Sequence, residues 1–233
     1  MDKKRTGLML LAVAAVMLAG YWYFRQQPVV QISPPPPQMT VAQKKARFRA
    51  LLVPAVDDVY CRLLRQYRRV KRQLENGESN ARIAVLKKQY RANSDTDLLA
   101  ALKPHPRSIA LAQAALESNW ATSRFFWQAN NIFGVWSFDP NEPRLAAGRK
   151  RGDKTIYVKK YPSISAAVED YYLLLGRGSA FKEFRRARLE SDDPFVLVYK
   201  LDRYSERGRA YCDEVAAVIR HNNFDQYDRE RVE

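Results

Sequence analysis

The chain has 233 residues, of which 46% are hydrophobic and 12% aromatic, so it can bury one sizeable core and hardly two. Its formal charge of +15 favours an anionic partner, such as nucleic acid, an anionic membrane surface or an acidic cell-wall polymer. Two histidines and two cysteines are too few and too scattered for a zinc site or a Cys–His nucleophile, so no metal and no cofactor is expected. Cys61 and Cys212 either form a disulfide or remain two buried thiols.

The N-terminus begins with a basic segment and continues as an uncharged apolar run over residues 7–24, which ends in four aromatic residues. A bilayer span needs about 17 to 25 residues, aromatic side chains favour the interface, and basic flanks stay in the cytoplasm. We predict that residues 1–25 form a retained signal anchor, with the rest of the chain outside the cytoplasmic membrane. A cleaved signal peptide is the alternative, and it would place Met17 where a small residue is needed.

A proline-rich segment, residues 26–40, follows the anchor and contains the run Pro34 to Pro37. Such a run favours the extended polyproline conformation, which predicts a semi-rigid linker. Residues 41–91 are predicted to be a basic helical extension, because apolar residues recur at three- and four-residue spacing as far as Leu74. We expect Pro54 to break the first helix of this extension in two.

One face of the extension is basic, and it carries Arg62, Arg65, Arg68, Arg69, Lys71 and Arg72. This face could meet anionic lipid or polymer, although a solvated helix face is the favoured interpretation. Asn76-Gly77 predicts a turn and Ala81–Tyr90 a second helix. Ser94 or Asp95 then caps a short helix that ends near Leu102.

The central stretch begins with Lys-Pro-His-Pro at residues 103–106, which interrupts the chain, and His105 is interpreted as part of this turn. From Ile109 to Leu116 every residue except Gln113 is apolar, so the helix that follows is predicted to be buried on nearly all sides. It ends at Glu117. Burial and the negative end of the helix dipole both penalise an ionised carboxylate, so the pKa of Glu117 is expected to be raised, which suits a general acid. A solvated glutamate at a helix end is the alternative.

Amides and aromatic rings follow Glu117 closely, and these residue types hydrogen-bond sugar hydroxyls and stack on pyranose faces. They are Asn119, Trp120, Gln128, Asn130, Asn131, Phe133 and Trp136. Ordinary packing and turn formation are the alternative. Two extended segments, Ile132–Ser137 and Thr155–Tyr161, are predicted to pair as a small β-hairpin. Their connection, residues 138–154, is expected to fold over Glu117 as one wall of a cleft.

The remainder of the chain is predicted to be helical. Helices are expected at about residues 161–176, 180–189, 194–201 and 209–222. Ser163 or Ser165 caps the first of them and Gly176 stops it. The charged tail, residues 225–233, is expected to fray.

A close resemblance to the glucosaminidase domain of glycoside hydrolase family 73 runs from Ala110 to Phe138, with the sequence ALAQAALESNWATSRFFWQANNIFGVWSF. This family contains peptidoglycan hydrolases such as the flagellar protein FlgJ and bacterial autolysins. The match continues in Tyr161-Pro162-Ser163, Asp170-Tyr171, Tyr204-Ser205 and Tyr211. The Lys-Pro-His-Pro segment together with residues 133–138 is similar to the Bax-type branch, and the resemblance covers roughly residues 92–222.

The resemblance implies an α+β fold, in which a mainly helical lysozyme-like domain with a small β-hairpin lobe, residues 92–224, follows the N-terminal transmembrane helix. It implies hydrolysis of the β-1,4 bond between N-acetylglucosamine and N-acetylmuramic acid, with Glu117 as the catalytic acid. Glu142 is predicted to be the second catalytic group, with Asp139, Asp153 or the substrate's own acetamido group as substitutes. The implied substrate-binding residues are Asn119, Trp120, Asn130, Asn131, Phe133, Trp136, Tyr161, Tyr171, Tyr204 and Tyr211.

The implied partners are peptidoglycan glycan strands and, through the anchor, the inner membrane of a bacterium, crossed once, with the domain on the periplasmic or extracytoplasmic side. Nucleic acid is not expected, because it conflicts with an exported domain. A lytic transglycosylase or a muramidase acting on the same polymer is the alternative enzyme. A non-catalytic envelope tether that binds peptidoglycan is the alternative from another class of protein. The sequence leaves the oligomeric state open.

Overall fold

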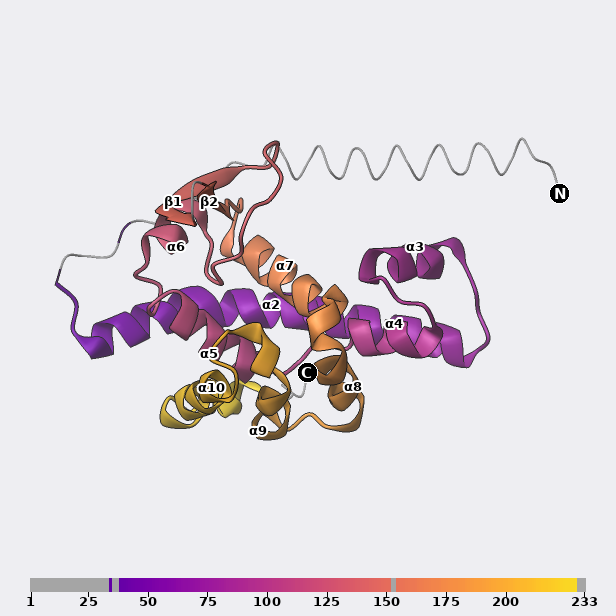
Figure 1. Ribbon diagram of the computed structural model, residues 1–233. Helices are drawn as coiled ribbons and strands as arrows, with labels where there is room; N and C mark the ends of the chain where they lie inside the picture. Colours follow the sequence, from indigo (N-terminus) through magenta and orange to yellow (C-terminus); the bar gives the residue numbers. More distant parts are fainter. Residues whose placement is uncertain (1–33, 35–37, 152–153, 230–233) are drawn as a thin grey trace.

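The computed structural model describes residue 34 and residues 38–151 and 154–229. Its helices in chain order (Figure 1) are α2 (Val41–Glu75), α3 (Ala81–Tyr90), α4 (Asp95–Leu102), α5 (Arg107–Glu117), α6 (Arg124–Ala129), α7 (Ile164–Arg177), α8 (Lys182–Glu190), α9 (Pro194–Leu197) and α10 (Arg209–His221). The strands β1 (Arg144–Arg151) and β2 (Lys154–Lys159) form one antiparallel sheet. The predicted signal anchor lies outside the described residues, among which no helix is both long and apolar enough to span a membrane.

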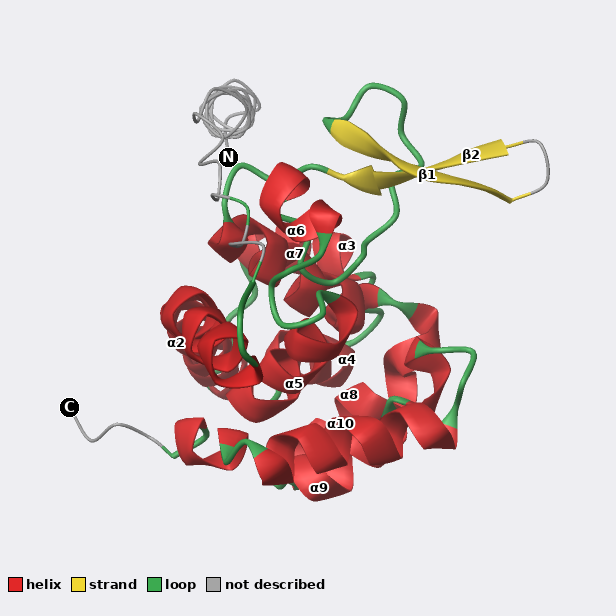
Figure 2. Cartoon of the chain, turned by 90° about the vertical axis from the view of Figure 1, so that its left-hand side faces the viewer, coloured by secondary structure: helices red, strands yellow, loops and turns green. Residues whose placement is uncertain are grey.

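The molecule has two lobes, a helical body and a small strand lobe that projects from it (Figure 2). This confirms the prediction of a mainly helical α+β domain with a small strand lobe. The main hydrophobic core lies inside the helical body and is built from α2, α5, α7 and α10. Helix α5 lies at its centre, and its residues from Arg107 to Ala115 are all buried. The chain ends this central helix at Glu117, beside the strand lobe.

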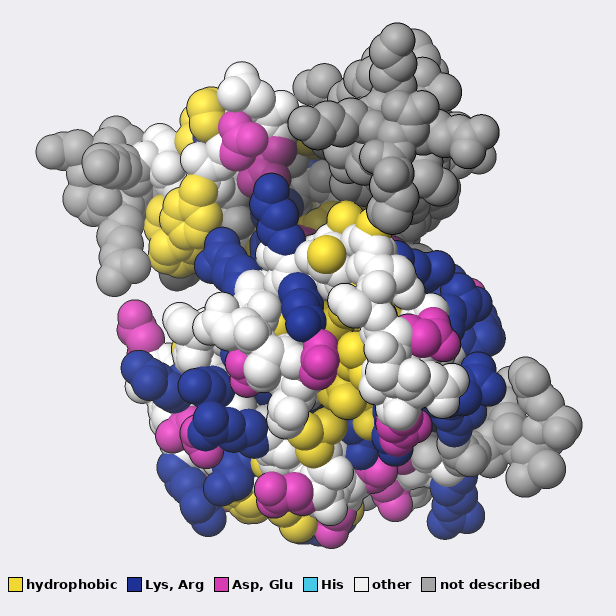
Figure 3. All heavy atoms as spheres, turned by 90° about the vertical axis from the view of Figure 1, so that its right-hand side faces the viewer, with side chains coloured by type: hydrophobic (Ala, Val, Ile, Leu, Met, Phe, Trp, Pro, Cys, Tyr) yellow, Lys and Arg dark blue, Asp and Glu magenta, His cyan; other side chains and the backbone are white. Residues whose placement is uncertain are grey.

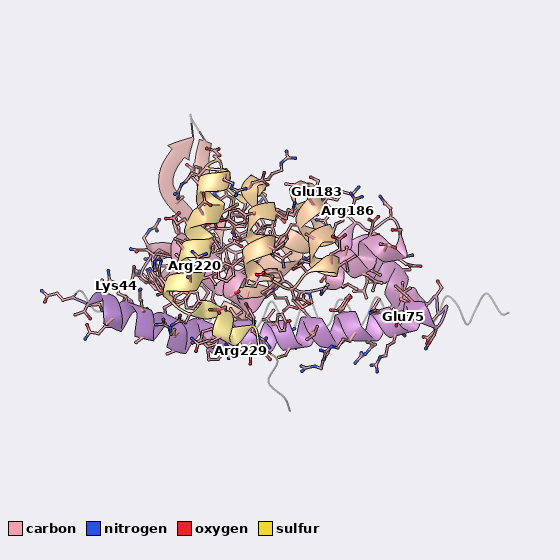
Figure 4. All side chains as sticks on the ribbon, turned by 90° about the horizontal axis from the view of Figure 1, so that it is seen from below. Lys44, Glu75, Glu183, Arg186, Arg220 and Arg229 are labelled. Atoms are coloured by element: carbon pink, nitrogen blue, oxygen red, sulfur yellow. The ribbon has the colours of Figure 1, made fainter. Side chains whose placement is uncertain are left out.

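Helix α2 runs without interruption for 35 residues, about 52 Å, along one side of the molecule, as seen from below in Figure 4. The predicted break at Pro54 is therefore wrong. Proline costs a helix interior about 3 kcal/mol, since it removes one backbone hydrogen bond. Buried residues on both sides of it, from Phe48 to Leu52 and from Val56 to Leu63, hold the two halves against the same core. Tertiary packing therefore overrides the local preference.

Helix α2 packs inside the core of the domain that follows it. Phe48, Leu52 and Val56 belong to the same hydrophobic cluster as Ile109 on α5 and Ile219 on α10. The far end of α2 packs with α3 and α4 in a second cluster. The predicted domain boundary at residue 92 stays a prediction. In the structure, helix α2 of the basic extension is part of the core that surrounds the central helix α5.

Two predicted helix boundaries are confirmed by their caps. Ser94 and Ser163 each accept a hydrogen bond from a backbone N–H in the first turn of α4 and α7. Ser123 caps α6 in the same way. The prediction that Gly176 stops its helix is wrong, because α7 continues to Arg177. Gly176 instead allows a close approach: an added Cβ would lie 2.9 Å from a ring carbon of Tyr90.

The β-hairpin differs from the predicted one. The second strand lies close to its predicted place, but its partner β1 falls inside the predicted connection. The segment Ile132–Ser137 lies along the opposite edge of β2 and meets it in an isolated bridge between Trp136 and Val158. Strand β1 lacks apolar alternation because it is an edge strand with exposed Ala146 and Gly148, and its register shifts between Ala146 and Lys150.

The start of the charged tail is structured, since Phe224–Tyr227 form a short 3-10 helix, so the expectation of fraying is wrong for residues 225–228. Asp228 accepts a hydrogen bond from the backbone N–H of Ser108 at 2.9 Å. It thereby caps the N-terminus of α5, where Pro106 has no side chain that could do so. Residues 230–233 lie outside the described residues. Both cysteines are free thiols, Cys61 half-buried on α2 and Cys212 buried on α10, which decides between the two alternatives left open by the sequence.

Candidate active site

A cavity of about 430 Å³ lies between the strand lobe and the helical body. Figure 3 shows the surface hollowed below the strand lobe. The charged side chains that line the cavity are Glu117, Lys159, Asp170 and Arg177. Its aromatic side chains are Phe133, Trp136, Phe138, Phe181 and Tyr204. A groove lined by aromatic rings with a few carboxylates fits a carbohydrate.

Glu117 stands at the C-terminal end of α5 and faces this cavity. Its side chain is exposed on the cavity side, and the protein packed around the rest of it still raises the pKa of its carboxyl group. Desolvation is the main cause, and it outweighs the hydrogen bond from Tyr211, which lowers the pKa. The hydroxyl of Tyr211 donates to Oε1 of Glu117 at 2.8 Å. A carboxyl group in this state can hold a proton and is held in one orientation.

A chain of buried hydrogen bonds runs from Glu117 into the core. Nε2 of Gln113 donates to the hydroxyl of Tyr211 at 3.0 Å, and the hydroxyl of Tyr171 donates to Oε1 of Gln113 at 2.5 Å. Nε2 of His105 lies 3.1 Å from the same Tyr171 hydroxyl. We call these five residues the relay. It joins the Lys-Pro-His-Pro turn at one end of α5 to the carboxylate at the other end.

The relay has one consistent arrangement of protons. Because Tyr171 gives its only hydroxyl proton to Gln113, its oxygen accepts from His105, which must carry a proton on Nε2. Burial, with a smaller contribution from Arg188, holds the pKa of His105 well below its ordinary value, so the ring is neutral. Every hydrogen bond of the relay therefore points its donor toward Glu117.

The backbone reverses its handedness directly after Glu117. Asn119, Trp120 and Ala121 all have left-handed conformations, with φ of 50°, 60° and 61°. Such residues cost roughly 1–2 kcal/mol each unless the surroundings hold them. Ser118 holds this turn, since its hydroxyl donates to the carbonyl of Ala114 and accepts from the N–H of Ala121. The chain thereby leaves α5 abruptly, with Glu117 at its edge.

The left-handed turn also decides where the predicted sugar-binding residues next to Glu117 lie. The ring of Trp120 packs edge-on against Phe48 at 5.3 Å and near Phe224, in the core and outside the cavity lining. Asn119 is exposed, and its carbonyl accepts from the hydroxyl of Thr122. A role of Trp120 or Asn119 in substrate binding stays a prediction, for which these positions give no support.

Two of the predicted amides make structural hydrogen bonds. Nδ2 of Asn130 donates to the carbonyl of Tyr161 at 2.9 Å. Asn131 donates to the carbonyls of Val135 and Lys159 and accepts from the N–H of Val135. These bonds fasten the segment that carries Phe133 and Trp136 onto β2, so the amides position the aromatic wall of the cavity.

The predicted aromatic residues fall into two groups. Phe133, Trp136 and Tyr204 line the cavity, and Trp136 keeps 41% of its surface exposed. Tyr171 is fully buried, with its ring stacked 3.9 Å beneath that of Phe133, and Tyr211 is buried beside Glu117. The latter two therefore support the cavity from behind.

Tyr161 supports a carboxylate of the cavity. Its hydroxyl donates to Oδ2 of Asp170 at 2.7 Å, and Nζ of Lys159 lies 3.0 Å from the same oxygen. Glu142 is half-buried behind Lys159, at 3.8 Å from its Nζ, and is not part of the cavity lining. Asp139 is exposed in a turn, and Asp153 lies outside the described residues. Asp170 is thus the described carboxylate that shares the cavity with Glu117.

Sequence reasoning missed Asp170 and Gln113 as members of the site. Gln113 carries a readable signal: it is the polar exception in a buried helix, four residues before Glu117, and therefore on the same helix face. Asp170 carries only its place before Tyr171 in the family resemblance. In the described part of the chain, no group of three or more His, Cys, Asp or Glu side chains could hold a metal ion.

A mainly helical body, a small strand lobe and a carboxylic acid at the end of a buried helix between them define the class of lysozyme-like glycoside hydrolases. Residues 96–224 match the family model Glucosaminidase, described as mannosyl-glycoprotein endo-beta-N-acetylglucosaminidase. The match spans more than half of the chain, which therefore belongs to this family, glycoside hydrolase family 73, as its sequence motifs predict.

Relatives and a solved structure agree with this assignment. The chain is 29% identical over 123 residues to protein bax of Escherichia coli K12, covering 50% of this chain and 43% of that protein. It is 27% identical over 137 residues to the exo-glucosaminidase LytG of Bacillus subtilis 168, covering 52% of this chain and 45% of that protein. It thus spans less than half of either relative. The catalytic domain of the autolysin Auto from Listeria monocytogenes superposes with a TM-score of 0.51 at 18% identity, over 83% of this chain and all of that domain, which shows the shared fold.

Proposed function

We propose that the chain is an endo-β-N-acetylglucosaminidase that hydrolyses the β-1,4 bond between N-acetylglucosamine and N-acetylmuramic acid in peptidoglycan. The observation that carries the proposal is Glu117, a carboxyl group with a raised pKa that faces an aromatic cavity in a glucosaminidase-family domain. The relatives contribute the substrate class, since one of them is named as an exo-glucosaminidase and the structural neighbour as an autolysin.

Glu117 acts as the general acid. It gives its proton to the glycosidic oxygen of the leaving sugar while positive charge grows at the anomeric carbon. Its desolvated site favours the protonated form before this transfer. After the transfer, the hydroxyl of Tyr211 donates to the newly formed carboxylate. The relay behind Tyr211 keeps this donor in place.

A second group must stabilise the charged anomeric carbon or activate water. Glu142 remains one candidate, and Asp170 is a second, favoured by its position in the cavity. Lys159 lies between them, 3.0 Å from Asp170 and 3.8 Å from Glu142. If Asp170→Asn abolishes hydrolysis and Glu142→Gln does not, Asp170 holds the role. If both variants stay active, Asp139, Asp153 and the substrate's acetamido group are the remaining candidates.

Exposed rings at the cavity edge offer stacking surfaces for sugar rings. Trp136 is 41% and Phe138 84% exposed, and their rings lie 6.2 Å apart. Exposed aromatic rings that gather into one patch beside a cavity are typical of a ligand-binding surface. We assign them to adjacent sugars of the glycan strand.

The proposed location follows from the sequence. Residues 1–25 would anchor the chain in the inner membrane of a bacterium and leave the domain on the periplasmic side, next to the cell wall. Protease added to spheroplasts should digest the domain, and extraction should require detergent. Release of the chain by osmotic shock, or its protection from the protease, would contradict this location.

Incubation of the full-length chain with purified sacculi tests the activity. We expect soluble fragments with reducing N-acetylglucosamine ends from the wild type, none from Glu117→Gln, and full activity from Glu78→Gln, an exposed glutamate on the turn after α2. Reducing N-acetylmuramic acid ends would indicate a muramidase, and anhydromuramoyl ends a lytic transglycosylase. Release of single sugars alone would indicate exo cleavage. Binding to sacculi without any release would leave the non-catalytic tether.

A further inference from the structure

A second cavity, of about 240 Å³, lies where the end of α3 and helix α4 meet the end of α7 and helix α8. We call it the basic pocket. The cations that line it are Arg91, Arg177, Lys182, Arg185 and Arg186, and its single lining carboxylate is Asp97. Figure 3 shows Lys and Arg side chains gathered on this face of the molecule, below the hollow under the strand lobe. The site described above does not use this pocket.

The basic pocket adjoins the cavity that contains Glu117, which we call the catalytic cavity. Arg177, in the last turn of α7, lines both of them. Helix α7 also carries Asp170, which lines the catalytic cavity. Asp170 precedes Arg177 by seven residues, or about 10 Å along the helix axis. A polymer lying in the catalytic cavity therefore has the basic pocket within reach of its substituents.

The charges of the pocket are only partly neutralised. Arg185 is committed to structure, since its Nη1 donates to the carbonyls of Leu175 and Gly178 at the end of α7. Arg186 pairs at 3.3 Å with Glu183, next to it on the outer face of α8 (Figure 4). Within the described part of the chain, no ion pair occupies Arg91, Arg177 or Lys182.

Like charges gathered around one cavity repel each other and favour a ligand of opposite charge. Guanidinium groups bind carboxylates through two parallel hydrogen bonds. In peptidoglycan each N-acetylmuramic acid bears a short peptide with free carboxylates, attached directly to the glycan. Substrate carboxylates are therefore delivered beside the catalytic cavity at regular intervals.

We propose that the basic pocket binds the carboxylates of a stem peptide on the glycan strand that occupies the catalytic cavity. This inference rests on the proposed function and deepens it: the enzyme distinguishes peptide-bearing glycan from bare glycan. Arg91 and Lys182 supply exposed cations at the pocket, whereas Arg177 touches both parts of the substrate. The acidic peptide contributes binding and leaves the chemistry at Glu117 unchanged.

The test compares three forms of the same glycan strands: with native peptides, with peptide carboxylates converted to neutral amides, and with peptides removed by an amidase. The full-length chain should cleave the native strands with a KM about three- to tenfold lower than the other two, at similar kcat. The double variant Arg91→Gln/Lys182→Gln should lose this difference and keep its activity on bare strands. The control Arg82→Gln/Lys88→Gln removes two exposed cations from α3 away from this pocket and should keep the difference.

Equal KM values of the wild type for all three substrates would overturn the inference, while hydrolysis itself would keep the proposed function intact. Absence of hydrolysis on every substrate would instead refute the proposed function. A preference for native strands that survives in the pocket variant would also overturn the inference. If that variant in addition loses binding to vesicles of anionic phospholipid, the pocket serves a membrane surface instead.

Discussion

Removal of the Tyr211 hydroxyl is the most direct test of how the site controls its acid. This hydroxyl donates to Glu117 at 2.8 Å, and the bond lowers the pKa of the carboxyl group against the effect of desolvation. In Tyr211→Phe the pKa of Glu117 should therefore rise further. A hydrogen bond to a charged group contributes about 1.5–3 kcal/mol when buried. Because Glu117 is exposed in the cavity, we take about 1 kcal/mol, or about fivefold in its ionisation constant.

The assay is the pH dependence of kcat/KM on glycan strands. A general acid works in its protonated form, so activity falls as the pH rises through its pKa. In Tyr211→Phe this alkaline limb should move to higher pH. The matched control is Tyr204→Phe, because the ring of Tyr204 stacks on that of Tyr211 at 5.4 Å and, within the described residues, does not hydrogen-bond Glu117. Its alkaline limb should move much less.

An alkaline limb that stays in place in Tyr211→Phe, or moves to lower pH, would refute this reasoning. The variant also leaves the buried Nε2 of Gln113 without its acceptor, which should cost about 1–3 kcal/mol of unfolding free energy. Thermal unfolding separates this loss of stability from the change at Glu117, because the loss of stability persists at every pH.

Three further predictions concern stability. Because the pKa of Glu117 is raised in the fold, its contribution to stability is complete in acid and is lost as the pH rises through that pKa. At neutral pH, Glu117→Gln should therefore be more stable than the wild type by a few tenths of a kcal/mol and unfold at a higher temperature, whereas in acid the two should be equally stable. Equal unfolding temperatures at neutral pH would contradict this. Pro54→Ala restores a backbone donor inside α2 and should stabilise by about 1–2 kcal/mol, raising Tm; a lower Tm would mean that the helix needs its proline. Gly176→Ala places a Cβ 2.9 Å from Tyr90 and 3.1 Å from the carbonyl of Ala101, and should cost about 1–3 kcal/mol in urea unfolding, whereas a gain would show that the helices can separate.

The helices were predictable because local signals and tertiary packing agree there. Serine caps and apolar periodicity place α4 and α7 within a few residues, and Ala81–Tyr90 is found as predicted. Pro54 is the exception, because burial on both sides outweighs a local penalty. Strand β1 carries no alternation to read, although Gly152-Asp153 in the sequence is the kind of dipeptide that joins two strands tightly.

The acid of the candidate site could be predicted, and its surroundings only in part. Glu117 ends an apolar helix, a pattern that links sequence to burial directly. Asp170 and Arg177 join it across more than fifty residues, and no spacing rule connects them. The amides Asn130 and Asn131 have the residue types of a sugar site, yet the Nδ2 group of each donates to a backbone carbonyl. Residue type alone does not tell a ligand contact from a turn.

Glu117 lies between two opposed electric dipoles, one from helix α5 and one from the relay. Helix α5 ends at this residue, so the negative end of its macrodipole disfavours the carboxylate and helps to keep the proton on. The hydrogen bonds from His105 to Tyr211 all point their positive ends the other way, toward the carboxylate oxygen. One field suits the acid before it gives up its proton, and the other suits the anion afterwards. Since both are fixed by buried groups, the change of charge during the reaction requires little movement of the protein.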